Sequence, residues 1–134
     1  GRKKEIIITA GGKNIAPKNI ESALRDSEIV SQAVIIGDRR RFLSALITLD
    51  DEKAGALASS NGYPLHERPE VREALEKVVS DVNERFSRVE HVRKFTILPA
   101  QFSVDGGELT PTLKIKRSVV AQKYSDLIEK MYMA

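Results

Sequence analysis

Three cations gather in the stretch ELTPTLKIKR, residues 108–117 of this 134-residue chain: Lys114, Lys116 and Arg117. The proline fixes its own φ at about −65° and pushes Thr110 toward extended conformations, so we expect a constrained loop rather than a helix or a linker. A lysine held on such a loop can neutralise negative charge that develops during phosphoryl or acyl transfer. The alternative is a solvated basic turn in front of a helix.

The second candidate is a glycine-rich turn that consists of Gly11, Gly12, Lys13 and Asn14. Glycine permits positive φ or a close approach of the backbone to a ligand, and the amides of such a turn can bind phosphate oxygens. Further cations, Arg2 and Lys4, precede the turn. Taken alone, each of the two stretches is a weak signal, because solvated basic turns are common.

Composition excludes several other kinds of site. Without cysteine the chain has no disulfide, thiolate zinc site or cysteine nucleophile, as expected for a reducing compartment. The two histidines, His66 and His91, have no partner at ligand spacing, so no metal held by the chain's own residues is predicted. Neither a phosphate-binding P-loop nor a serine nucleophile elbow is present.

Charge and hydropathy bear on the partners. The 22 basic residues are interleaved with 19 acidic ones, and the net charge is only +3, so no nucleic-acid partner is predicted. The rival interpretation is a stand-alone basic module that binds nucleic acid or an acidic partner through residues 39–41 and 114–117. Aromatic residues, which would stack on bases, make up only 5% of the chain and so speak against nucleic-acid binding. No apolar run approaches the ~20 residues that span a bilayer. The chain begins at Gly1 without methionine, so we expect a piece of a longer protein.

Strands and helices alternate around the two candidate loops. Periodicity and turn signals predict strands at residues 5–9, 29–36, 43–49 and 95–98, with a brief return strand at Ile15, and helices at 17–27, 51–60, 69–90 and from Ser118 onward. Strand 43–49 should have two unequal faces, helix 69–90 should bury a stripe from Val71 to Val89, and Ser118 should cap the last helix. The sequence therefore predicts one α+β domain: a small N-terminal β-hairpin plus a central mixed sheet of about three strands flanked by helices.

Together and in this order, the two loops resemble the C-terminal domain of the adenylate-forming enzymes. The matching motifs are GRKKEIIITAGGKNIAPKNIE, residues 1–21, and LTPTLKIKR, residues 109–117. The residues of these motifs are most similar to those of the long-chain fatty acyl-CoA synthetases, and the resemblance covers residues 1–134. It implies that the chain is the mobile C-terminal domain of an enzyme whose large N-terminal domain is absent.

The resemblance implies a role for each residue of the first motif. Arg2 would contact the ribose or phosphates of ATP, and Lys4 would be the hinge about which the small domain rotates. Gly12 would lie beside the pantetheine tunnel of coenzyme A, with Gly11, Lys13 and Asn14 as its neighbours on the same loop.

In the second motif, Lys114 would be the catalytic lysine that reaches the carboxylate and α-phosphate during adenylation. Lys116 falls at a variable position of the family and receives no role. Leu113 stands where many relatives have glycine, which is a departure from the family pattern.

The implied activity is AMP-forming ligation of a long-chain fatty acid to coenzyme A, with ATP and Mg²⁺, and the 134-residue chain alone should be inactive. The implied partners are its own large domain, the fatty acid, ATP and coenzyme A. The expected location is the cytoplasm, or the membrane periphery for the full-length enzyme. A nearer rival is an acyl-AMP ligase that passes its acyl group to a carrier protein.

Overall fold

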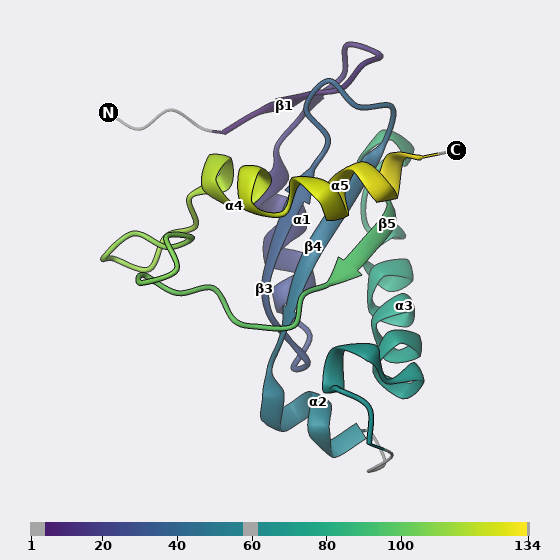
Figure 1. Cartoon of the computed structure of the whole chain (residues 1–134). Coiled ribbons are helices and arrows are strands. Elements are labelled where there is room, and N and C mark those ends of the chain that lie inside the picture. The colour runs from purple at the N-terminus through teal and green to yellow at the C-terminus, as the bar shows by residue number, and fades with distance from the viewer. Residues whose placement is uncertain (1–4, 58–61, 134) are drawn as a thin grey trace.

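The computed structural model describes residues 5–57 and 62–133, whose course is drawn in Figure 1. Near the N-terminus β1 (Ile7–Ile8) and β2 (Asn14–Ile15) pair antiparallel and enclose the glycine turn. The predicted N-terminal hairpin is therefore confirmed, with strands shorter than expected.

The larger sheet has the strand order β3-β4-β5. In it β3 (Val30–Ile36) runs antiparallel to β4 (Leu43–Leu49), and β5 (Val92–Ile97) runs parallel to β4. This small mixed sheet, with helices around it, confirms the predicted α+β fold.

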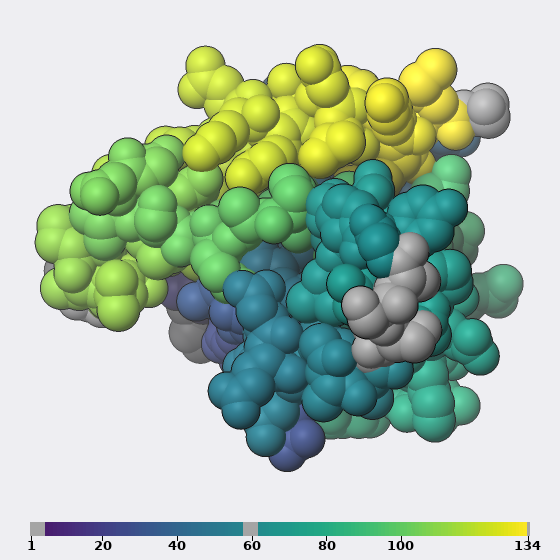
Figure 2. Space-filling view, turned by 60° about the horizontal axis from the view of Figure 1, so that its bottom comes forward, coloured from purple at the N-terminus to yellow at the C-terminus, as the bar shows by residue number. Residues whose placement is uncertain are grey.

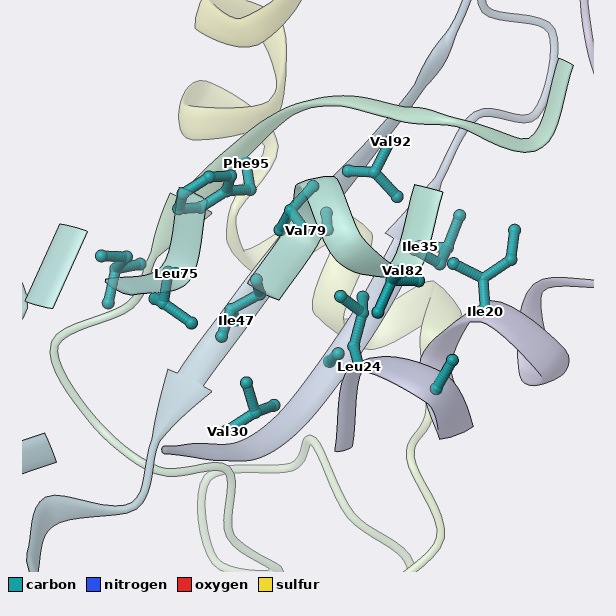
Figure 3. Packing of buried hydrophobic residues seen from close by; sticks show 14 of the residues in the cluster. Ile20, Leu24, Val30, Ile35, Ile47, Leu75, Val79, Val82, Val92 and Phe95 are labelled. Atoms are coloured by element: carbon teal, nitrogen blue, oxygen red, sulfur yellow. The ribbon is translucent and has the colours of Figure 1, made fainter. Parts of the chain in front are cut away.

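Helices cover both faces of this sheet (Figure 1). On one face, α1 (Pro17–Arg25) and α3 (Pro69–Asn83) share a core with the strands. Figure 3 shows side chains of these helices, such as Leu24 and Val79, close to Ile47 of β4. Both helices begin with proline, which fits the first helical position because its missing N–H has no acceptor there.

The opposite face of the sheet is covered by α4 (Arg117–Lys123) and α5 (Ser125–Tyr132). Consequently all seven side chains of β4 are buried, including the polar Ser44 and Thr48. The two faces of β4 therefore differ in the side chains they carry, as predicted, but both faces are buried. Period-2 alternation could not show this, because the second covering layer lies about 70 residues further along the chain.

Two helices that the sequence predicts as continuous are shorter in the structure. The 69–90 helix ends at Asn83, whose side chain both donates to the carbonyl of Val92 (3.0 Å) and accepts from its N–H (2.8 Å). A separate 3-10 turn, η2 (Arg88–Glu90), follows, so the prediction that Val89 is buried is wrong: it is 46% exposed.

The C-terminal helix begins at Arg117, one residue before the predicted cap Ser118, and Lys116 is its N-cap. It is divided at Tyr124, where ψ is 26°, into α4 and α5. Along the chain, α2 (Asp51–Leu57) and the 3-10 turn η1 (Leu65–Glu67) lie between β4 and α3. Of the helices in the described residues, none is long and apolar enough to cross a membrane.

Candidate functional site

The lysine loop, residues 109–115, is a small hairpin closed by its own hydrogen bonds. Leu109 and Ile115 form an antiparallel bridge. Inside it, the N–H of Thr110 donates to the carbonyl of Lys114 (2.8 Å), and the hydroxyl of Thr110 accepts from the N–H of Lys114 (3.0 Å). The backbone of Lys114 is thus fixed twice by one residue, while its side chain is exposed, as the sequence predicts.

Leu113 forms the tip of the lysine loop in a strained conformation. Its φ of 64° lies in the left-handed region, and its N–H donates to the carbonyl of Thr110 (2.8 Å) across the turn. A side chain in this region costs roughly 1–2 kcal/mol, whereas glycine adopts it without a Cβ clash. The leucine is 64% exposed, so burial does not offset this cost. A leucine at this tip therefore keeps the loop's shape at the expense of stability.

The entry to the lysine loop is fixed by a buried carboxylate. Glu108 is 2% exposed and accepts hydrogen bonds from the N–H of Ser103 (3.0 Å) and from Nζ of Lys123 on α4 (2.5 Å). Burial opposes ionisation of Glu108, yet the bonds from Lys123 and Ser103 outweigh it and lower its pKa. Gly106 lies against the same carboxylate, where a Cβ would come within 2.4 Å of Glu108 Oε1.

The C-terminal end of the lysine loop is fixed by Arg117, which the sequence groups with Lys114 and Lys116 as one of three neighbouring cations. Its guanidinium binds Glu21 of α1 with two nitrogens (Nη1–Oε2 2.7 Å, Nη2–Oε1 3.1 Å). It also donates from Nε to Glu5 (2.8 Å). Burial lowers the pKa of Arg117, but the carboxylates of Glu21 and Glu5 outweigh it and raise the pKa. Arg117 is therefore part of the fold rather than of an exposed basic patch.

The lysine loop borders a hollow between itself and α1. The residues that line it include Thr110, Leu113 and Lys114 on the loop, and Lys18 and Arg25 on α1. In the space-filling view of Figure 2, the segment that carries the loop protrudes from the body of the domain. Lys114 is thus presented at the rim of a concave surface on a projecting element.

The glycine turn is also held by its own hydrogen bonds. Gly12 has a φ of 81°, and its N–H donates to the carbonyl of Thr9 (2.9 Å). The side chain of Thr9 in turn accepts from the N–H of Lys13 (3.1 Å). Nothing lies within 4 Å of a Cβ built on Gly12, so glycine is needed there for its φ and not for space. All four residues of the turn, Gly11 to Asn14, are exposed.

Sequence reasoning missed the basic surroundings of the glycine turn. A hollow beside it is lined by Lys13 together with Arg41, Arg88 and Arg93, which come from three other parts of the chain. The structure does not bring the glycine turn and the lysine loop together: Figure 1 shows them at different ends of the domain. The two candidate sites therefore face different directions.

A family model described as "AMP-binding enzyme C-terminal domain" matches residues 4–134. The chain belongs to this family. A curated relative, the long-chain-fatty-acid--CoA ligase FadD15 of Mycobacterium tuberculosis, is 45% identical over 98% of this chain. The long-chain-fatty-acid--CoA ligase ACSBG2 of Gallus gallus is 40% identical over the same share. The chain spans only 23% and 20% of the length of these two relatives.

Solved structures share the fold of this AMP-binding C-terminal domain at lower identity. The adenylation domain of a carboxylate reductase from Mycobacterium chelonae has a TM-score of 0.80 at 22% identity, and 96% of this chain covers 19% of that one. A fatty acyl CoA synthetase from Mycobacterium tuberculosis has a TM-score of 0.60, also at 22% identity, with 94% and 21% covered. At this identity the likeness concerns the fold alone.

The described residues include Lys114 and the glycine turn of this AMP-binding C-terminal domain but not every predicted site residue. Arg2 and Lys4, predicted as an ATP contact and as the hinge, lie outside the described residues. Their roles stay predictions. The contacts of the described part begin at Glu5, which joins Arg117 and lies 3.9 Å from Nζ of Lys18.

Proposed function

We propose that this AMP-binding C-terminal domain is the catalytic lid of an ATP-dependent long-chain fatty acid–CoA ligase and supplies Lys114 to the adenylation step. The observation that carries the proposal is the lysine loop, which fixes the backbone of Lys114 by two bonds to Thr110 and leaves its side chain exposed. The 45% identity to a long-chain-fatty-acid--CoA ligase supports the choice of substrate.

The proposed reaction has two steps. A fatty acid carboxylate oxygen attacks the α-phosphorus of ATP, the bond to the bridging oxygen breaks, and pyrophosphate leaves. The thiol of coenzyme A then loses its proton, its sulfur attacks the acyl carbon, and AMP leaves with the carboxylate oxygen. In the first step Lys114 would place its ammonium beside the negative charge on the carboxylate and α-phosphate, an effect that is worth a few kcal/mol in a closed site.

The separate placement of the two loops, at different ends of the domain, supports a rotation between the steps. If Lys114 faces the large domain during adenylation, the glycine turn faces elsewhere, and a turn of the small domain about Lys4 would exchange them. The turn at residues 11–14 would then line the path of the pantetheine arm. Within the described residues no group of three His, Asp or Glu side chains could hold a metal ion, so none of them is assigned to Mg²⁺.

The acceptor could instead be a carrier protein, as in the rival acyl-AMP ligase. Its support is the TM-score of 0.79 to the A-PCP didomain of a carboxylic acid reductase from Segniliparus rugosus. That likeness, at 22% identity, concerns fold, so the 45% identical ligase outweighs it. The stand-alone basic module loses support because Arg117 is bound by carboxylates and Arg40 by Glu129.

The test is Lys114→Ala in the longer enzyme that carries this domain. Pyrophosphate exchange should fall by about 10²–10³-fold, the usual cost of removing one donor to a developing anion. Thioester formation from supplied acyl-adenylate should stay close to wild type, and acyl-CoA should be the product with a long-chain fatty acid. Lys116→Ala, two residues further along the same backbone and also exposed, is the matched control. Equal losses in both half-reactions would refute the assignment.

A further inference from the structure

Arg117 joins three parts of the fold that are far apart in the sequence. Besides its two bonds to Glu21 and one to Glu5, it donates from Nη1 to the carbonyl of Ile35 on β3 (2.9 Å). All three guanidinium nitrogens are therefore used. The side chain is 21% exposed, and that of Glu21 is 5% exposed, so this is a largely buried ion pair and not a surface contact.

Glu21 is itself fixed by the edge strand. Its Oε2 accepts from the N–H of Ile35 (2.7 Å), the residue whose carbonyl binds Arg117. Glu21 and Arg117 thus satisfy both backbone groups of Ile35 on the side of β3 that faces away from β4. An arginine fork bound at each nitrogen has little freedom to rotate, which is not true of a single lysine contact.

This ion pair forms one of two anchors of the lysine loop. Arg117 lies three residues after Lys114, and its partners belong to the body of the domain. At the other end, Glu108 lies one residue before the loop and binds Lys123. The N–H of Lys116 also donates to the carbonyl of Glu108 (2.7 Å), which joins the two ends. The position of Lys114 relative to α1 and β3 is therefore set chiefly through Arg117.

We infer that Arg117, held by Glu21, is a positioning residue for adenylation: it sets where the ammonium of Lys114 lies when the lid is closed. The inference rests on the proposed function of Lys114. It goes beyond that function because it assigns an effect on one half-reaction to a largely buried ion pair that lines the same hollow as Lys114. Arg117 has no contact with substrate in this assignment and acts only through Lys114.

The first test is Arg117→Lys in the full-length enzyme. Lysine keeps the charge but cannot span Glu21, Glu5 and Ile35 at once, so the loop gains freedom. We expect kcat for pyrophosphate exchange to fall roughly 10- to 100-fold, since a displacement of about 1 Å can cost 10²-fold. KM for ATP and thioester formation from supplied acyl-adenylate should change less than about twofold, because Lys114 takes no part in the second step.

The decisive measurement combines Arg117→Lys with Lys114→Ala. If Arg117 acts through Lys114, the double variant should adenylate no more slowly than Lys114→Ala alone. A purely structural role would add its loss in either background and would slow both half-reactions alike. Additive losses, or equal losses in the two half-reactions, would therefore overturn the inference.

One further variant replaces Arg117→Lys if that protein does not fold, and another serves as a control. If Arg117→Lys does not fold, Glu21→Gln carries the same test: its one remaining oxygen can still accept from the N–H of Ile35, while the charge and the second acceptor for Arg117 are lost. Arg72→Lys is the matched control: Arg72, on α3 and away from the loop, donates to the carbonyl of Phe95 on β5 (3.3 Å), and its replacement should leave both steps unchanged. Normal adenylation by Lys114→Ala would overturn the proposed function, and this inference with it. Normal adenylation by Arg117→Lys beside a slow Lys114→Ala would overturn this inference alone.

Discussion

Replacing Glu21 with alanine should destabilise the isolated chain strongly. The change removes the carboxylate that binds the largely buried guanidinium of Arg117 in bidentate fashion. It also removes the acceptor for the N–H of Ile35. Removing one partner of a buried ion pair costs about 3–5 kcal/mol. Since Arg117 keeps Glu5 and the Ile35 carbonyl, we expect the lower end, about 3 kcal/mol.

The corresponding shift in Tm follows from chain length. An unfolding entropy of about 2.1 cal/mol/K per residue gives roughly 280 cal/mol/K for 134 residues, so 3 kcal/mol lowers Tm by about 11 °C. Thermal unfolding followed by far-ultraviolet circular dichroism measures it. Glu5→Ala is the control, because Glu5 binds the same arginine but is 42% exposed; its loss of about 0.5 kcal/mol should lower Tm by only about 2 °C. Equal shifts for the two variants would refute the argument from burial.

Three further changes test the anchoring of the lysine loop. Gly106→Ala should lower the free energy of unfolding by about 1–3 kcal/mol in urea titrations, because the new Cβ would overlap Glu108. Glu108→Gln should be less stable than wild type at pH 7. Because folding lowers the pKa of Glu108, its carboxylate stabilises the fold above the ordinary pKa of 4.5, and this stabilisation is lost as the pH falls through the lower pKa of the folded state. The difference in Tm between the variant and wild type should therefore shrink in acid. Leu113→Gly should raise the urea midpoint slightly, since relief of roughly 1–2 kcal/mol of backbone strain exceeds the added chain entropy of about 0.5–1 kcal/mol.

Local signals were sufficient for the features that local chemistry decides. The turn with Gly12 at positive φ, the helix start at Pro17 and the constrained backbone before Lys114 are as the sequence predicts, because glycine and proline restrict the backbone whatever surrounds them. The end of α3 was not predictable in this way. Asn83 ends that helix by binding Val92, which only becomes its neighbour when the sheet forms.

The anchors of the candidate site depend on contacts that the sequence separates widely. Glu21 and Arg117 are 96 residues apart, and nothing in residues 108–117 indicates that one of the three cations is buried. One signal was available: Glu21 lies on the stripe of Pro17 and Leu24, with helical spacings of four and three, all three of them buried in α1. A carboxylate on a buried stripe requires a charged or hydrogen-bonding partner. The sequence therefore indicated that Glu21 has a partner but not that this partner is Arg117.

The covering of the second sheet face by α4 and α5 limits when this domain can fold during translation. Val34 of β3 and Leu46 of β4 are buried there against Val120 and Ile128, which are made after the last strand. At about 5–20 residues per second, the ribosome needs roughly 2–7 s to pass from the end of β5 to that of α5. For that interval the nascent sheet presents an apolar face to chaperones, and a chain truncated before Arg117 should bind a hydrophobic dye that the whole chain excludes.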